Sequence, residues 1–286
     1  MPTPTPEPTR SPAPGPRQLQ PTARSFGAEA DRYDRARPRY PDALVHRIAT
    51  TTPGPEIPDI LDVGSGTGIV ARQFQAAGCR VLGVEVDARM AELARRSGVE
   101  AEVASFEEWD PAGRAFDAVV SAQAWHWVDA VAGAAKAAQV LRPGGRLALF
   151  WNVFQPSAAV TDAFAEVHDR VLPDTPNLWG KPALDSYAPQ FAEATDGIRR
   201  AGDAFGEPEE WRYEWEHTYT RDEWLDLLPT HGRTAQLPPA RLTELLTTTG
   251  AALDALGGDF AVHYTTVAIT ALRTPDAASR PASARP

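Results

Sequence analysis

The chain has little cysteine, few basic residues and no long apolar run, and each shortage excludes a class of protein. One cysteine, Cys79, occurs among the 286 residues, so no disulfide can form within the chain. The 28 Lys and Arg residues are outnumbered by 38 Asp and Glu residues, and the net charge of −10 argues against a nucleic-acid partner. No apolar stretch reaches the roughly 18 residues that a membrane-spanning helix needs. These features are typical of a cytoplasmic protein with no membrane partner.

Proline is concentrated at the N-terminus, which reads "MPTPTPEPTRSPAPGPRQLQP". Proline lacks the backbone N–H that helices and sheets require, and this stretch has no apolar signal-peptide core. Residues 1–22 are therefore predicted to be a disordered or polyproline-like tail. The stretch "TPDAASRPASARP" at 274–286 is predicted to be a second flexible tail.

Short apolar runs alternate with segments of helical periodicity up to Asn152. This alternation is typical of a doubly wound α/β sheet with right-handed crossovers. Strands are predicted at 57–63, 80–86, 99–103, 115–121 and 146–152, and helices at 69–78, 88–98 and 131–142, the last of them stopped by Pro143.

The pattern changes after Asn152. An apolar stripe from Val160 to Val171 predicts a helix, and 173–210 is predicted to be irregular because it is rich in Pro, Gly, Asp and Glu. We expect 153–210 to form a cap over the active site and 211–273 to complete the core sheet begun by 23–152. Within 211–273, the expected order is a strand at 211–220, helices at 221–228 and 238–256, and a last strand at 259–273. This last strand is expected to run antiparallel to the strand at 211–220.

The stretch "ILDVGSGTGIVARQF" (60–74) places glycines at 64, 66 and 68 after the first predicted strand. Glycine lets a ligand approach main-chain N–H groups without a Cβ in the way. No Lys-Ser or Lys-Thr pair follows, which excludes a Walker-type phosphate loop, and G-x-G-x-G differs from the dinucleotide spacing G-x-G-x-x-G. Glu85 ends the second predicted strand, where its carboxylate could accept hydrogen bonds from two ribose hydroxyls.

Four segments together resemble the class I S-adenosylmethionine-dependent methyltransferases. They are "FGAEADRYDRARPRYP", "LDVGSGTG", "FDAVVSAQAWHWV" and "LRPGGRLALFWN", and they are most similar to the small-molecule branch that includes trans-aconitate-type methyltransferases. The resemblance covers about 24–152 and implies S-adenosylmethionine as cofactor. It also implies a mostly parallel seven-stranded sheet with an antiparallel last strand and a small cap insertion.

The resemblance also implies roles for individual residues. Asp62 would orient the glycine loop or the cofactor's amino group, and Glu85 would hold the ribose. Many relatives carry an Asp for the adenine where this chain has Ser105, and Phe106 would either stack on the adenine or belong to the core. The full set of expected cofactor-binding residues is Tyr33, Asp62, Gly64, Gly66, Gly68, Glu85, Ser105, Phe106, Ala122 and Gln123.

His126 is the candidate catalytic residue, because a histidine can take a proton near neutral pH. Its alternative role is to hydrogen-bond the backbone or the cofactor. Of its neighbours Trp125 and Trp127, one is expected to face the pocket and the other the core. The expected substrate-binding residues are Arg37, Trp125, Trp151, Asn152, Trp179 and Tyr187, and no metal-ligand spacing occurs.

The leading hypothesis is methyl transfer to a small molecule with an aromatic or heteroaromatic part, as in secondary metabolism. Transfer to oxygen, nitrogen and carbon are all open. A small organic acid methylated on its carboxyl group is the second substrate class. Two further functional classes stay open: a nicotinamide-dependent oxidoreductase and a non-catalytic ligand-binding protein of the same fold.

Overall fold

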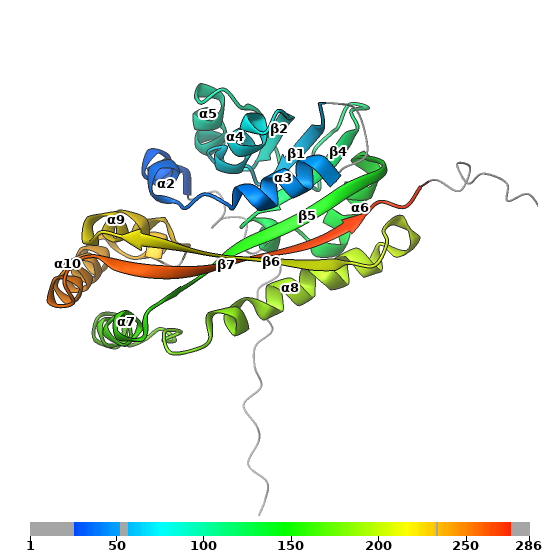
Figure 1. Ribbon diagram of the computed structural model, residues 1–286. Helices are drawn as coiled ribbons and strands as arrows, with labels where there is room; N and C mark the ends of the chain where they lie inside the picture. Colours follow the sequence, from blue (N-terminus) through cyan, green and yellow to red (C-terminus); the bar gives the residue numbers. More distant parts are fainter. Residues whose placement is uncertain (1–25, 52–56, 233, 276–286) are drawn as a thin grey trace, which may run out of the picture.

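The computed structural model describes residues 26–51, 57–232 and 234–275, and it contains a seven-stranded sheet (Figure 1). The predicted tails lie outside the described residues, except for residues 274 and 275. The strand order is β3-β2-β1-β4-β5-β7-β6. The strands are β1 (Asp59–Val63), β2 (Arg80–Glu85), β3 (Glu100–Val103), β4 (Phe116–Ala122), β5 (Leu141–Pro156), β6 (Glu209–Tyr219) and β7 (Phe260–Leu272).

β1 to β5 are parallel, and β7 runs antiparallel between β5 and β6. The predicted fold and the antiparallel last strand are therefore confirmed. Successive residues of β1 enter different cores: Ile60 packs on one face of the sheet and Leu61 on the other. Both faces are apolar because helices cover both.

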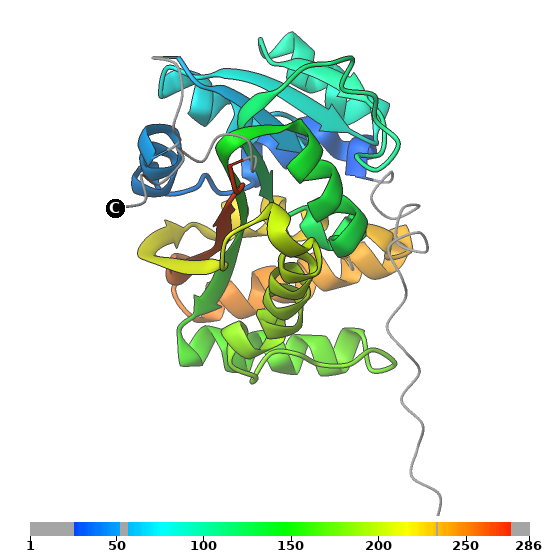
Figure 2. The ribbon, with the colours of Figure 1, turned by 90° about the vertical axis from the view of Figure 1, so that its right-hand side faces the viewer.

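Helices α3 (Asp42–Thr51), α4 (Ile69–Ala76) and α5 (Ala88–Arg96) pack on one face. Helices α6 (Ala130–Val140) and α8 (Ala183–Arg200) pack on the other (Figure 2). The remaining helices are α2 (Ala30–Ala36), α7 (Ala158–Val171), α9 (Arg221–Leu227) and α10 (Pro239–Ala255). Short 3-10 helices are η1 (Phe26–Glu29), η2 (Trp125–Trp127), η3 (Gly202–Ala204), η4 (Leu228–Thr230) and η5 (Thr234–Gln236).

The expectation that 173–210 is irregular was wrong, because α8 occupies 18 of these residues. Its buried face carries Phe191, Ala194 and Ile198 at helical spacing. Gly197 lets this helix approach α6, since a Cβ at that position would lie 2.4 Å from the carbonyl oxygen of Ala130. Pro189 and the acidic residues obscured this stripe in the sequence, but Pro189 is exposed and does not disturb the packing.

The helix expected at 131–142 ends slightly earlier, and the strand after it is longer than predicted. Leu141 is already extended and pairs with Phe116 of β4, so α6 ends at Val140. β5 then runs 16 residues, past the expected end at Asn152. Its extension pairs with β7 as far as Pro156 and carries the sheet toward the cap helices.

A third core lies where the neighbouring strands β5, β7 and β6 extend beyond the rest of the sheet, between α7, α9 and α10. Trp224 of α9 is fully buried there, stacked on Phe164 at 5.4 Å between ring centroids. α2 packs against α9, and Arg32 and Arg35 bind Asp226 with N–O distances of 3.1 and 2.8 Å.

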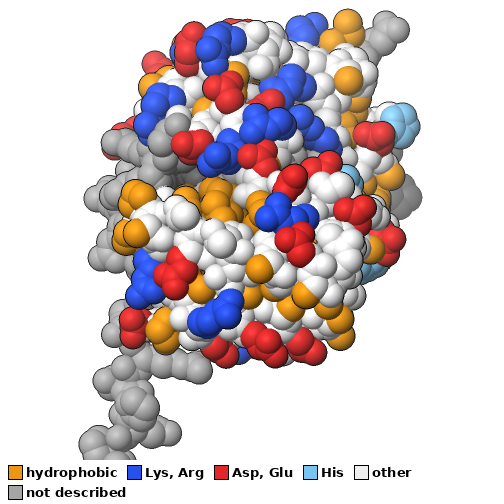
Figure 3. Space-filling model, turned by 90° about the vertical axis from the view of Figure 1, so that its left-hand side faces the viewer, with side chains coloured by type: hydrophobic (Ala, Val, Ile, Leu, Met, Phe, Trp, Pro, Cys, Tyr) orange, Lys and Arg blue, Asp and Glu red, His pale blue; other side chains and the backbone are white. Residues whose placement is uncertain are grey.

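On the face shown in Figure 3, acidic side chains are interspersed among the basic ones.

Candidate active site

The glycine loop turns from β1 into α4 at the carboxyl edge of the sheet. Gly64, Gly66 and Gly68 have φ values of +69°, +55° and +84°, which favour glycine. A Cβ on Gly64 would also lie 2.4 Å from the Cβ of Ala124, so this position admits no side chain. The Gly64 N–H donates to the carbonyl of Val84 at 2.8 Å, which fixes the loop against β2.

Asp62 lies beneath this loop and is fully buried. Neither of its carboxylate oxygens has a hydrogen-bond partner. Burial, with a smaller contribution from Glu85, raises the pKa of Asp62 to about 8. A buried carboxyl group without a partner costs stability, which is typical of a group kept for a ligand.

Glu85 ends β2, as predicted, and its side chain supports the loop. It accepts hydrogen bonds from the N–H of Gly66 and of Asp87, both at 2.8 Å. Burial raises the pKa of Glu85, while backbone N–H groups, that of Asp87 first, oppose the shift. The N–H of Val86 also acts on this carboxylate, so three of its four lone-pair sites face backbone donors and one remains.

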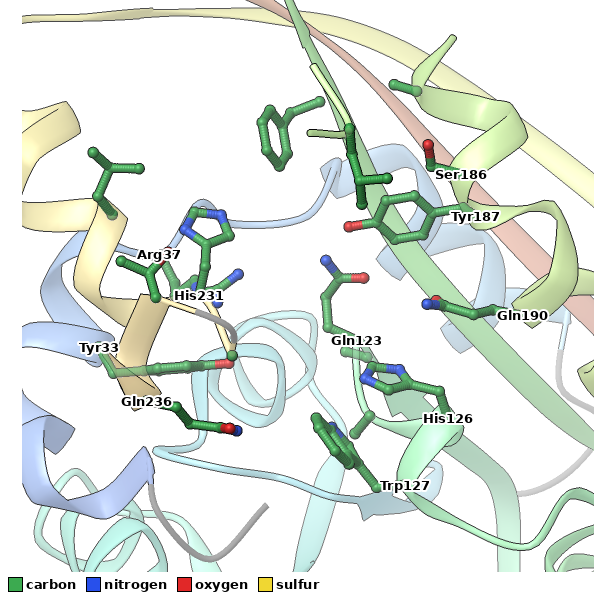
Figure 4. Close-up of a pocket in the computed structure, with 18 of the residues that line it drawn as sticks. Tyr33, Arg37, Gln123, His126, Trp127, Ser186, Tyr187, Gln190, His231 and Gln236 are labelled. Carbon is green, nitrogen blue, oxygen red and sulfur yellow. The ribbon is translucent and has the colours of Figure 1, made fainter. Parts of the chain in front are cut away.

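A cavity of about 1080 Å³ extends from the glycine loop to the cap. Its core side is lined by Gly64, Glu85, Ser105, Phe106, Ala122 and Gln123, all expected from the sequence. Its cap side is lined by Phe154, Trp179, Tyr187, Trp224 and His231. Figure 4 shows Tyr187 and Gln190 of α8 on one side of the cavity and Tyr33, Arg37 and His231 on the other. The cavity therefore joins the predicted cofactor region to an aromatic cap.

The structure separates the two tryptophans next to His126. Trp127 lines the cavity, whereas Trp125 is 2% exposed and packs against Phe106 in the core. His126 lines the cavity, its Nδ1 has no hydrogen-bond partner, and burial lowers its pKa to about 4. The ring is thus neutral at pH 7 and is a weaker base than a free imidazole.

Two expected substrate-binding residues lie in the core, and a third, Asn152, borders only a small second cavity of about 60 Å³. Trp125 belongs to the core, and so does Trp151, which is 1% exposed and packs on Phe191. Asn152 is buried in a hydrogen-bond network: it donates to the carbonyl of Arg39 and accepts from Thr266. Alternation along β5 explains this, since a residue at a strand end faces the pocket only if its register allows it.

Ser105 and Phe106 both border the cavity beside Glu85. Ser105 Oγ donates to Glu108 at 3.3 Å. Phe106 is 3% exposed and lies 6.4 Å from Trp109 in a stacked pair. Phe106 therefore serves the core and forms part of the cavity wall, so the two roles weighed for it are compatible.

Gln123 is held in a strained backbone conformation at the end of β4. Its φ of +55° is uncommon for a residue other than glycine. Its N–H donates to the carbonyl of Phe150 at 2.9 Å, and its side-chain amide donates to the carbonyl of Asn152 at 3.3 Å. The strain is therefore balanced by contacts that aim this side chain into the cavity.

Arg37 is a cation on the cavity wall. Its Nη2 donates to the carbonyl of Thr230 at 2.5 Å, its guanidinium lies 4.9 Å from the centre of the Tyr33 ring, and its Nε has no partner. No carboxylate among the described residues forms an ion pair with it. Arg37 therefore brings an uncompensated positive charge to the cavity.

His231 is a cavity residue that the sequence analysis missed. It follows η4, beyond the segment expected to form the cap, and no motif surrounds it. Its ring lies 5.6 Å from that of Phe154. Burial, and next the charge of Arg37, lower its pKa to about 3. The only signal in the sequence was an isolated histidine in a loop.

Comparison with known proteins identifies the domain that carries this loop. Residues 61–149 match the family model described as a methyltransferase domain. The chain carries a methyltransferase domain. This match confirms the expectation of a methyltransferase for this domain. It therefore favours the methyltransferase over the nicotinamide-dependent oxidoreductase as the function.

Relatives of similar sequence are also methyltransferases by name. An uncharacterised methyltransferase of Mycobacterium tuberculosis is 35% identical over 130 residues, which are 45% of this chain and 52% of that protein. The match thus spans about half the length of this relative. The malonyl-[acyl-carrier protein] O-methyltransferase of Enterobacter lignolyticus is 29% identical over 177 residues, 60% of this chain and 68% of that protein.

Solved structures share the fold of this chain over the methyltransferase domain and over most of the remaining residues. A protein of Anaeromyxobacter dehalogenans, described provisionally as a type II methyltransferase, superposes with a TM-score of 0.61 at 23% identity. The match covers 84% of this chain and 99% of that one. A protein of Anabaena variabilis, described provisionally as a methyltransferase from an antibiotic biosynthesis pathway, gives 0.54 at 17% identity over 80% of this chain and 98% of that one.

Two kinds of feature are absent from the part of the chain that the structure describes. No helix in these residues is long and apolar enough to cross a membrane. Within the same residues, no cluster of His, Cys, Asp and Glu could hold a metal ion.

Proposed function

We propose that this protein transfers the methyl group of S-adenosylmethionine to a small molecule with an aromatic or heteroaromatic part, of the kind found in secondary metabolism. The observation that carries the proposal is the continuous cavity that joins the glycine loop of the methyltransferase domain to the aromatic cap. The likeness to the trans-aconitate-type branch stays a prediction from the sequence.

The residues present fit S-adenosylmethionine. Asp62 has an unpartnered carboxyl group that would meet the ammonium group, and Gly64 keeps the loop free of a side chain, since a Cβ there would collide with Ala124. Glu85 has a lone pair left for a ribose hydroxyl. Ser105 and Phe106 line the cavity and would border the adenine, while Tyr33, Ala122 and Gln123 line it and would border the methionine part. The cofactor is therefore S-adenosylmethionine, as the sequence predicts.

When bound, S-adenosylmethionine supplies a methyl group on a positively charged sulfur. A lone pair of the acceptor can attack the methyl carbon, and the sulfur is then the leaving group. The chain's own contribution is to align the acceptor and exclude water, effects worth about 7–11 kcal/mol in well-oriented reactions. Trp179, Trp224 and Phe154 give the acceptor an apolar contact surface. Tyr33 and Trp127 add aromatic rings that attract a positively charged sulfur.

The uncompensated charge of Arg37 favours a second acceptor class, a small organic acid methylated on its carboxyl group. The named activity of the Enterobacter relative, which methylates malonyl-[acyl-carrier protein], is compatible with this class. Such an acceptor needs no base, because its oxygen is already ionised at neutral pH.

The first experiment is calorimetric titration with S-adenosylhomocysteine, with NAD as control. We expect micromolar binding of S-adenosylhomocysteine and none of NAD. Folded protein that binds neither would contradict the proposed function. Binding without methyl-label transfer to any of a broad acceptor panel would favour a non-catalytic ligand-binding protein.

A further inference from the structure

The large cavity continues along β5 beyond the end of β4. Ala122, which ends β4, pairs with Phe150 of β5, and both Ala122 and Pro156 border the cavity. Pro156 lies six positions beyond Phe150 in the same strand, so the cavity runs about 20 Å along β5 at about 3.4 Å per residue. Pockets for one drug-sized ligand have volumes of about 300–1,000 Å³, so the cavity of about 1080 Å³ has room for a second molecule beside the cofactor.

The far end of this cavity lies against α7, which Figure 1 shows beyond the end of β5 and away from α5. Asn177 ties the segment after α7 to this helix by donating to the carbonyl of Ala165 at 3.1 Å. Leu172 packs against the buried apolar cluster between α7 and α10, and Leu178 is 44% exposed. We call this end the distal pocket, and its lining includes Pro156, Ala158, Thr161, His168, Leu172 and Leu178.

The polar groups of the distal pocket are occupied by other protein groups. Thr161 Oγ1 donates to the carbonyl of Pro156 at 3.4 Å, and Nε2 of His168 lies 3.0 Å from Oγ1 of Thr175. Nδ1 of His168 is closed to solvent and does not reach the cavity surface. A ligand in the distal pocket therefore meets apolar surface and polar groups that are already paired.

Two charged residues, Asp162 and Lys181, also line the cavity, but both are exposed. Their charged groups can stay in water while a ligand occupies the distal pocket. A hydrocarbon chain needs no hydrogen-bond partner there. An amide-rich chain, such as pantetheine, would instead leave polar groups unpaired against apolar surface, which costs binding free energy.

We propose that the distal pocket binds a hydrocarbon chain of the methyl acceptor. The acceptor is then an amphiphile, with an aromatic or heteroaromatic head beside the cofactor and an alkyl or acyl chain that extends toward Pro156. A ring system without a chain would leave Leu172 and Leu178 in contact with water. Each methylene group buried against this surface should tighten binding about fourfold. This inference rests on the proposed function.

The test is calorimetry on protein saturated with S-adenosylhomocysteine, using two pairs of probes that differ only in chain length. They are 4-butylphenol and 4-octylphenol, and 4-butylbenzoate and 4-octylbenzoate, so that the result does not depend on one head group. We expect the octyl probe to bind about 100-fold more tightly than the butyl probe, because four more methylene groups are buried. Pantetheine should bind more weakly than either octyl probe.

Two pairs of variants locate the chain. Leu178→Glu should reduce the advantage of the octyl probe at least about tenfold, whereas Leu256→Glu should keep the wild-type advantage. The two leucines are matched, with 44% and 43% of their surface exposed, but Leu256 lines neither cavity. Ala158→Trp should fill the distal pocket and weaken only the octyl probes. Ala159→Trp, at the next exposed position of α7, should have no such effect.

The outcomes separate this inference from the proposed function. Wild-type protein that does not bind S-adenosylhomocysteine would contradict the proposed function itself. Wild-type protein that binds it but binds octyl and butyl probes within about threefold of each other, with both head groups, would overturn the inference alone. Tighter binding of pantetheine than of the octyl probes would also overturn it, in favour of an amide-rich chain. Equal effects of Leu178→Glu and Leu256→Glu would remove the chain from the distal pocket.

Photo-crosslinking gives a second readout that does not depend on turnover. A 4-octylphenol with a diazirine at the end of its chain is irradiated in the complex with S-adenosylhomocysteine, and the labelled peptide is identified by mass spectrometry. We expect the label within residues 156–178. A label found only outside this range would overturn the inference.

Discussion

The two sides of the cavity are built in opposite ways. The core side comes from one continuous part of the chain, in which the ends of β1, β2 and β4 meet at one edge of a parallel sheet. The cap side is assembled from distant segments: Arg37 and Thr230, for example, are 193 positions apart. The core side carries the carboxyl groups Asp62 and Glu85, whereas the cap side carries aromatic rings, Arg37 and His231.

This difference assigns two separate tasks. Backbone geometry and buried carboxyl groups can recognise a constant ligand, because the position of neither depends on the cap. An aromatic wall that includes the cation Arg37 selects a variable acceptor by shape and charge. Changes on the cap side should therefore alter stability or acceptor turnover, while changes on the core side should alter cofactor affinity.

The largest expected effect is on the cap side. Trp224→Ala removes a fully buried ring that touches Phe164, Tyr219 and Phe260, and should lower the free energy of unfolding by about 3–5 kcal/mol. Chemical denaturation measures this change. S-adenosylhomocysteine affinity at about 15 °C should stay within about tenfold of wild type, because Trp224 lines the cap side of the cavity and not the core side that carries Glu85. A parallel collapse of affinity in folded protein would show that the two sides are not independent.

Gly64→Ala should abolish measurable cofactor binding, with a loss of about 100-fold or more, because the new Cβ combines a close contact with Ala124 and a strained φ. Gly78→Ala is the matched control, since Gly78 has φ +88° but nothing within 4 Å of the added Cβ. Gly78→Ala should lower stability because of its strained φ, but its affinity for S-adenosylhomocysteine should equal that of wild type. Calorimetry distinguishes the two, and equal affinities would show that the close packing of Gly64 on Ala124 does not set the loop conformation that binds the cofactor.

Glu85→Ala should weaken S-adenosylhomocysteine binding about tenfold or more, since charge-assisted hydrogen bonds contribute roughly 1.5–3 kcal/mol. It also leaves the N–H groups of Gly66 and Asp87 without an acceptor. Glu100→Ala, at an exposed position on β3, is the control. Unchanged affinity in Glu85→Ala would remove the ribose assignment.

The last effect is the smallest for a single pH unit, and it concerns the pH dependence of stability. The folded protein holds the Asp62 proton up to about pH 8, whereas the unfolded chain releases it near pH 4, so this group makes stability fall as pH rises between these values. Its contribution is at most about 1.4 kcal/mol per pH unit. Asp62→Asn should flatten the fall in stability measured from pH 5 to 8 and should weaken S-adenosylhomocysteine binding. Parallel stability curves for the two proteins would contradict the buried, protonated Asp62.

The sequence by itself determined the core side of this protein. The alternation of apolar runs and helices dictated the parallel sheet, and the spacing from Gly64 to Glu85 placed the loop and the acid at one edge of it. These are local features, since a turn conformation and a strand end depend on residues nearby in the chain. α8 was missed because Pro189 and acidic residues masked a helical stripe that becomes clear only against α6.

Only the tertiary structure decided the cap side. It placed Trp125 and Trp151 in the core, Trp127 at the cavity and His231 beside Arg37. No local pattern could predict these outcomes, because side-chain register and long-range packing decide which residues face a cavity. The pKa of His231 depends in turn on its burial and on a charge nearly two hundred residues away along the chain.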